Sequence, residues 1–160
     1  MDINKSKNWQ YPTVEEQKKY RQTLERTDKN KILSQLPALH NKAFENINCL
    51  TCANCCRNFS PRIKTPDLKR IARHLKMKEG AFIEKYLFLD EDGDYVVNAK
   101  PCPFLSPDNY CSIYDVRPSD CKRFPYTDED VIVKRQNITI KNSSFCPIVV
   151  FVLDGLGKKI

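Results

Sequence analysis

The segment of the sequence best suited to chemistry is CLTCANCC at residues 49–56, where four cysteines follow the pattern C-x2-C-x2-C-C. Four more occur downstream, which gives the full set of Cys49, Cys52, Cys55, Cys56, Cys102, Cys111, Cys121 and Cys146. A C-x2-C pair places two sulfurs on the same side of a tight turn, at the spacing that one tetrahedral metal or cluster accepts. We therefore predict that all eight cysteines are metal ligands.

Disulfides and unligated buried thiols are the two competing interpretations of these cysteines. Adjacent Cys55 and Cys56 fit poorly in a simple disulfide framework. The polar stretch MDINKSKNWQYPTVEEQKK lacks the apolar segment and cleavage site of a secretory signal, so an oxidising compartment has no support. Idle buried thiols would be scattered among apolar residues, whereas most of these cysteines lie in polar or proline-containing segments. We favour metal ligation and expect a cytoplasmic protein.

The spacing also limits how the ligands are shared. Because the neighbouring side chains of Cys55 and Cys56 diverge in most backbone conformations, we expect them to serve different sites or one polynuclear centre. Two sites of four sulfurs would account for all eight cysteines. Three thiols at C-x2-C-x2-C plus a remote Cys-Pro are typical of ferredoxin-like ligation, and Cys102 and Cys146 each precede a proline. This slightly favours an iron–sulfur cluster and leaves Zn²⁺ as the alternative.

The elements that must position the cysteines are predicted to be mostly helical. Thr13 and Glu16 fit a capping box that starts a long polar helix, which Pro37 should interrupt. A short second helix over residues 38–46 would then lead to Cys49. This polar N-terminal part is a candidate surface for a protein partner.

Beyond the cysteine run, Thr65 as N-cap and Pro66 as first helical residue predict a helix with one apolar stripe. The stretch AFIEKYLFL predicts a second helix, so we expect a helix pair. The stretch DEDGDYVV predicts a turn and a short strand, and VIVKRQNITIKN predicts one or two strands. The run CPIVVFVL is too short to cross a bilayer, and we expect it to be a buried strand or short helix.

These elements predict a small single-domain metalloprotein, mostly α with a few short β-strands and long loops around a cysteine-ligated centre. We assign residues 1–44 to an N-terminal helical arm and residues 45–160 to the cysteine-cluster domain. His40 has no ligand-like spacing and His74 lies beside the predicted apolar stripe, so both are predicted to be surface or core residues. The predicted function is metal binding, with a structural, storage or electron-carrying centre.

The formal charge of +7 is concentrated directly after the cysteine run, because residues 57–78 carry eight basic side chains and one acidic side chain. Two thiolate sites of about −2 each would lower the formal charge from +7 to about +3. We interpret the basic segment as compensation for thiolate charge together with an ordinary solvated helix face. Nucleic acid is not an expected partner, because no stacking aromatic residues accompany the basic residues, and no membrane is expected.

The run CLTCANCC, followed by TPDLKRIARHL, CPFL, CSIYDVRPSDCKRFP and a late CP, resembles the CxxCxxCC (YkgJ-type cysteine-cluster) family of zinc- or iron-chelating proteins. The resemblance covers about residues 45–150 and implies a small cytoplasmic metalloprotein. Some relatives join a similar module to lysine methylation of proteins, with flagellin as substrate. The alternative function is therefore a metal-dependent enzyme that modifies protein side chains. The chain shows no glycine-rich loop after a strand and has only four glycines, which weakens this alternative.

Three residues of this signature, Arg117, Arg123 and Tyr114, are expected around the ligands. The arginines could donate to sulfurs or to nearby carbonyls. The competing interpretation is a salt bridge from either arginine to Asp115 or Asp120. The apolar lining that limits solvent access is predicted to be Phe104, Leu105, Ile113, Tyr114, Phe124 and Tyr126.

Overall fold

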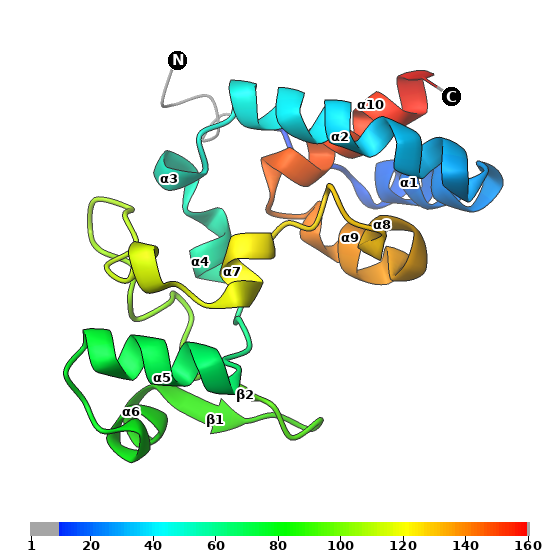
Figure 1. The fold of residues 1–160 in the computed structure, drawn as a ribbon. Helices are drawn as coiled ribbons and strands as arrows, with labels where there is room; N and C mark the ends of the chain where they lie inside the picture. The colour runs from blue at the N-terminus through cyan, green and yellow to red at the C-terminus, as the bar shows by residue number, and fades with distance from the viewer. Residues whose placement is uncertain (1–9, 160) are drawn as a thin grey trace. The chain divides into compact units, whose positions relative to one another are not determined.

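The computed structural model describes residues 10–159, so residues 1–9 of the predicted arm lie outside the described residues. Helices dominate and a single pair of short strands accompanies them in the described part of the chain (Figure 1), which confirms the predicted fold class. The division into an arm at 1–44 and a domain at 45–160 stays a prediction about which part folds independently.

The chain forms two compact units. Unit 1 combines Met1–Cys52 with Pro125–Ile160, and unit 2 is the intervening Ala53–Phe124. The helices of unit 1 are α1 (Val14–Arg26), α2 (Lys29–Asn46), α3 (Cys49–Cys52), α8 (Val131–Lys134), α9 (Gln136–Asn142) and α10 (Pro147–Lys159). The elements of unit 2 are α4 (Asn54–Asn58), α5 (Thr65–His74), α6 (Glu79–Tyr86), β1 (Leu87–Leu89), β2 (Tyr95–Val97), the 3-10 helix η1 (Tyr114–Val116) and α7 (Ser119–Arg123).

The predicted capping box at the start of α1 is confirmed. The backbone N–H of Glu16 donates to Oγ1 of Thr13 at 3.2 Å, and the N–H of Thr13 donates back to Oε1 of Glu16 at 3.5 Å. Two orphan donors at the helix start are thereby satisfied.

The prediction that Pro37 ends the first helix was wrong. The break comes earlier, because Asp28 caps a new helix by accepting the backbone N–H of Lys31 at 3.1 Å. Pro37 lies inside α2, where it removes one helical hydrogen bond. Burial of Leu36 and Leu39, which are 1% and 3% exposed, offsets that loss and keeps α2 continuous.

The predicted strands in VIVKRQNITIKN were also wrong, since this stretch forms α8 and α9. Its β-branched residues favour strands only weakly, and tertiary burial overrides the preference. Ile132, Val133 and Ile140 are buried in unit 1, where α8 packs on α2 and α9 packs on α1. The salt bridge from Lys134 to Asp130, 2.7 Å long, adds a local helical contact.

The apolar run CPIVVFVL is the first part of α10, which packs against α2 and α1. Ile148, Val149 and Val152 have no exposed surface. Within residues 10–159, no single helix has the length and apolar character needed to span a membrane. Within this range, only the segments Gln136–Asn142 and Pro147–Lys158 taken together have that length and apolar character, and this pair is bent by 118°.

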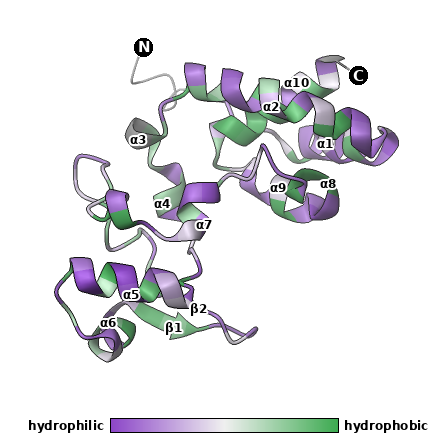
Figure 2. Cartoon of the chain, viewed as in Figure 1, coloured by the Kyte–Doolittle hydropathy of each residue, from purple (hydrophilic) through white to green (hydrophobic). Residues whose placement is uncertain are grey.

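In unit 2 the predicted helix pair is confirmed as α5 and α6, and the predicted turn and strand are confirmed by β2. Helix α5 begins at Thr65, one residue before the expected start, and the carboxylate of Asp67 accepts the N–H of Lys64 at 3.1 Å. Strands β1 and β2 pair antiparallel, with Leu87 opposite Val97. Figure 2 shows these strands as hydrophobic and much of α1 and α5 as hydrophilic.

The core of unit 2 joins α5, α6, both strands and the loop after residue 100. Its buried members are Ile63, Leu68, Ile71, Ala72, Phe82, Leu87, Val97, Phe104 and Ile113. The rings of Phe104 and Tyr86 lie 4.8 Å apart, and those of Phe104 and Phe82 lie 6.3 Å apart. Cys102 and Cys111 pack against this core, so the cysteine-bearing loop rests on ordered structure.

Candidate metal centre

The structure separates the cysteines into two sets. Cys102, Cys56 and Cys111 lie near enough to Cys121 for their charges to raise its pKa. We call these four cysteines of unit 2 the four-thiol set. In unit 1 the charges of Cys49 and Cys52 raise the pKa of Cys146 in the same way. We call these three cysteines the three-thiol set. Cys55 is the remaining cysteine, and its thiol donates to Cys56.

Main-chain hydrogen bonds bring the segments of the four-thiol set together. The N–H of Cys102 donates to the carbonyl of Cys56 at 2.7 Å, which joins α4 to a loop distant in sequence. Leu105 forms an antiparallel bridge with Cys111. The N–H of Cys121 donates to the carbonyl of Pro118 at 3.0 Å, a local bond at the start of α7. The α4 turn and the loop of residues 102–111 are therefore held together by main-chain bonds.

The two Cys-Pro motifs have the same local structure. The sulfur of Cys102 accepts from the backbone N–H groups of Phe104 and Leu105. The sulfur of Cys146 accepts from those of Ile148 and Val149, at the same two positions after the cysteine. Because proline has no N–H and a fixed φ, the next two N–H groups are the nearest backbone donors to the sulfur, and that of Leu105 also donates to the carbonyl of Cys102 at 3.0 Å. Hydrogen bonds of this kind favour a thiolate over a thiol.

Charge and burial act differently on individual thiols of the four-thiol set. The hydrogen bond from Cys55 lowers the pKa of Cys56 to about 7, against the effect of burial, and the guanidinium of Arg57 adds to the lowering. Burial raises the pKa of Cys102 to about 11, and the charges of Cys56 and Cys111 contribute to the rise. Cys56 is thus the thiol of this set that most readily ionises near neutral pH.

The three-thiol set combines a buried and an exposed cysteine. Cys146 is 6% exposed at the start of α10, and burial raises its pKa to about 12. Cys49 is exposed at the start of the one-turn helix α3, and Cys52 ends that helix. The pKa of Cys49 is nevertheless raised to about 12, by desolvation and by the charge of Cys52, because protein atoms surround the exposed residue.

The residues predicted around the ligands have distinct places. The Arg117 guanidinium lies 4.0 Å from the centre of the Tyr114 ring, and its charge favours the thiolate of Cys111. Tyr114 is 42% exposed, and its place among the residues that limit solvent access stays a prediction. Arg123 is exposed in the last turn of α7. Asp120 is buried and pairs with Arg62 at 3.0 Å.

Two residues that the sequence analysis missed fix the segment before Cys121. The carboxylate of Asp67 accepts the N–H of Ser119 at 3.1 Å, and Arg70 donates to the carbonyl of Arg117 at 2.8 Å. Burial opposes ionisation of Asp67, but bonds from Arg70, Lys64 and Ser119 hold its pKa below the usual value. A carboxylate in the first turn of a predicted helix is too common a feature to have signalled this role.

The histidines do not join either set. Nδ1 of His40 lies 2.8 Å from Oγ1 of Thr127 and makes a hydrogen bond, and His74 is exposed at the end of α5. Among residues 10–159, no three Cys, His, Asp or Glu side chains stand in an arrangement ready to hold a metal ion. The donor chemistry therefore fits a thiolate-bound metal, but the ligands must move closer together as it binds.

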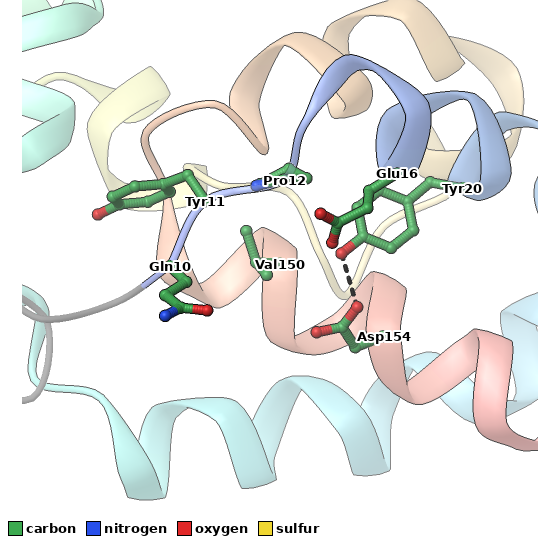
Figure 3. A pocket seen from close by; sticks show the side chains of 7 residues that line it. All are labelled: Gln10, Tyr11, Pro12, Glu16, Tyr20, Val150 and Asp154. Atoms are coloured by element: carbon green, nitrogen blue, oxygen red, sulfur yellow. Dashed lines mark hydrogen bonds between the residues drawn. The ribbon is translucent and has the colours of Figure 1, made fainter.

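A pocket of about 300 Å³ lies in unit 1 between residues 10–20 and α10 (Figure 3). It is lined by Gln10, Tyr11, Pro12, Glu16, Tyr20, Val150 and Asp154. The hydroxyl of Tyr20 donates to Oδ1 of Asp154 at 2.6 Å. Burial, then this bond and the Asp154 charge, raise the pKa of Tyr20. No cysteine lines the pocket, so it is separate from both thiol sets.

The fold and the two sets of thiols define a small, mainly helical cysteine-cluster protein. Residues 48–147 match the model of the CxxCxxCC family, described as "Putative zinc- or iron-chelating domain". Since the match covers more than half of the chain, the protein belongs to this family and is a metal-binding protein of that general kind. No curated protein and no solved structure matches the chain.

Proposed function

We propose that the protein holds metal through cysteine thiolates at two centres, and that iron–sulfur clusters are the favoured occupants. The observation that carries this proposal is the repeated Cys-Pro turn, with two backbone N–H groups donating to one sulfur in each set. Such donors stabilise metal-bound thiolates and adjust the potential of an iron–sulfur cluster. The proposed ligands of the first centre are Cys56, Cys102, Cys111 and Cys121.

The second centre is proposed at Cys49, Cys52 and Cys146. The sequence-based prediction of two four-sulfur sites would also give Cys55 a metal, in a site other than that of Cys56. This sharing stays a prediction. None of the eight cysteines forms a disulfide within the described residues, which agrees with a reducing compartment, so a cytoplasmic location is part of the proposal.

The choice between iron–sulfur and zinc depends on how far apart the sulfurs lie. One tetrahedral zinc ion, with Zn–S bonds of about 2.3 Å, needs its four sulfurs within roughly 4 Å of one another. The four thiols influence one another electrostatically, yet no three of the described ligand side chains are arranged for a single ion. A polynuclear core accepts a wider arrangement of sulfurs, so it would need less movement of these ligands on binding than a single zinc ion would. The proposed role is structural or electron-carrying.

Purification without oxygen, followed by metal analysis and a visible absorption spectrum, tests this function. We expect bound iron and sulfide with the broad visible absorption of an iron–sulfur protein. A colourless protein with stoichiometric zinc would support thiolate binding and overturn the cluster. A protein without metal after anaerobic purification and reconstitution would contradict the proposed function as a whole.

The substitutions Cys55→Ser and Cys56→Ser test how the ligands are shared. Each is expected to reduce metal content, but in different centres with distinguishable spectra. Loss of the same spectral component in both variants would contradict the prediction that Cys55 and Cys56 bind metal in different centres. Full metal content in Cys55→Ser would leave Cys55 as a hydrogen-bond donor to Cys56 and not a ligand.

A further inference from the structure

Solvent access differs between the two thiol sets. Cys49 is exposed, whereas the four cysteines of the four-thiol set are all partly shielded and Cys146 is buried. If the three-thiol set holds a metal, an incoming ligand can therefore approach it from the side of Cys49 without unfolding α10.

The backbone that carries Cys49 and Cys52 has less support than the loop that carries Cys102 and Cys111. Cys49 and Cys52 lie on α3, a helix of four residues, which is too short to be stable in isolation. In contrast, the loop with Cys102 and Cys111 is tied by the N–H of Ser112, which donates to the carbonyl of Phe104 at 2.7 Å. Burial of Phe104, 5% exposed, anchors that loop in the core of unit 2.

From these observations we propose that the three-thiol set is an exchangeable centre, through which metal enters and leaves, while the four-thiol set retains its metal. The proposal rests on the proposed function. In the exchange step, the sulfur of an incoming thiol bonds to the metal as the bond to Cys49 breaks. The proton of the incoming thiol passes to the Cys49 thiolate, so the charge of the site is unchanged. Cys146 stays bound, because burial keeps competing ligands away from it.

The exchange test uses the full-length protein purified without oxygen, with EDTA as acceptor and glutathione as the incoming thiol. Metal that remains bound is measured after desalting at successive times. We expect two phases, with the faster at least about tenfold faster than the slower and accelerated by glutathione. Cys49→Ser should remove the fast phase, whereas the matched variant Cys111→Ser should remove the slow one.

A second measurement guards against variants that fail to fold. In the unmodified, metal-loaded protein, brief treatment with iodoacetamide and peptide mapping should show Cys49 alkylated before Cys52 and Cys146, in step with loss of the fast phase. Release of all metal in one phase, or a fast phase that survives Cys49→Ser in a folded variant, would overturn the exchangeable centre. Those outcomes leave metal binding intact, whereas a protein that never holds metal defeats the proposed function as well.

Discussion

The two Cys-Pro turns share one local structure but depend on different supports. Pro103 follows Cys102 in a loop without regular structure, held by the aromatic packing of Phe104. Pro147 follows Cys146 at the start of α10, a buried helix of 13 residues. The same N–H donors therefore point to sulfur in both turns, but one turn needs tertiary contacts to stay in place and the other has a helix behind it. This difference predicts unequal responses to mutation and to metal removal.

The largest expected effect is that of Phe104→Ala. Removing this buried ring should cost about 3–5 kcal/mol of unfolding free energy and release metal from the four-thiol set. Denaturant unfolding with metal analysis measures both. Phe88→Ala is the matched control, because Phe88 is 51% exposed, and it should change stability little. Equal losses in the two variants would contradict the role given to Phe104.

Metal removal should loosen the loops before the helices. Because metal binding contributes to local folding, removing the metal anaerobically should speed amide exchange in residues 45–62 and 100–125 by about 100-fold. The amides of α10 should change much less, since its packing does not depend on the metal. Equally slow amide exchange in these loops with and without metal would contradict the predicted difference between the loops and α10.

Gly155→Ala tests the packing that supports the Cys146 turn. A Cβ at Gly155 would meet Cδ2 of Leu39 at 2.5 Å, so the Leu39 side chain, which is 3% exposed, or the helices that carry the two residues would have to shift. We expect a loss of about 1–3 kcal/mol, measured by denaturant unfolding. Gly157→Ala meets nothing within 4 Å and should instead raise stability through helix propensity. A neutral Gly155→Ala would mean that this contact is loose.

The raised pKa of Cys146 predicts a loss of stability of the metal-free protein at high pH. Its pKa rises from 9.0 to about 12 on folding, so the unfolded chain ionises first. The stabilising contribution is full below pH 9.0 and falls by about 1 kcal/mol per pH unit up to about pH 12. Thermal or denaturant unfolding between these limits measures the slope. Cys146→Val should reduce it, and an unchanged slope would assign the effect to other thiols.

The smallest expected effect concerns compensation of thiolate charge. Arg57 lowers the pKa of Cys56 and also donates to Oδ1 of Asn109. Arg57→Gln should therefore weaken metal binding a few-fold, or shift the reduction potential by the amount that corresponds to a few-fold change in an equilibrium constant. Lys64→Gln is the control, because Lys64 is exposed on the approach to α5. Tight salt-sensitive binding of DNA or RNA, lost in both variants, would favour a nucleic-acid surface over compensation.

The sequence by itself determined features that depend on neighbouring residues. The capping box at Thr13 and Glu16, the helix pair after residue 64 and the short strand at Tyr95–Val97 follow from local spacing and turn residues. The donor chemistry was also readable, because C-x2-C spacing and Cys-Pro are local patterns that determine which atoms can face a sulfur. The same local reasoning failed at Pro37 and over 131–142, where burial outweighed propensity.

Only the tertiary structure decided which cysteines belong together. Cys56 lies next to Cys55 in sequence, yet its carbonyl bonds to the N–H of Cys102, and the charges of both act on Cys121. Asp120 forms a salt bridge with Arg62, which no local pattern suggests. Such pairings depend on loop closure over many residues, which spacing alone does not encode, because the cost of closure changes slowly with loop length. Packing of the core therefore selects the partners, and the sequence pattern supplies only the donors.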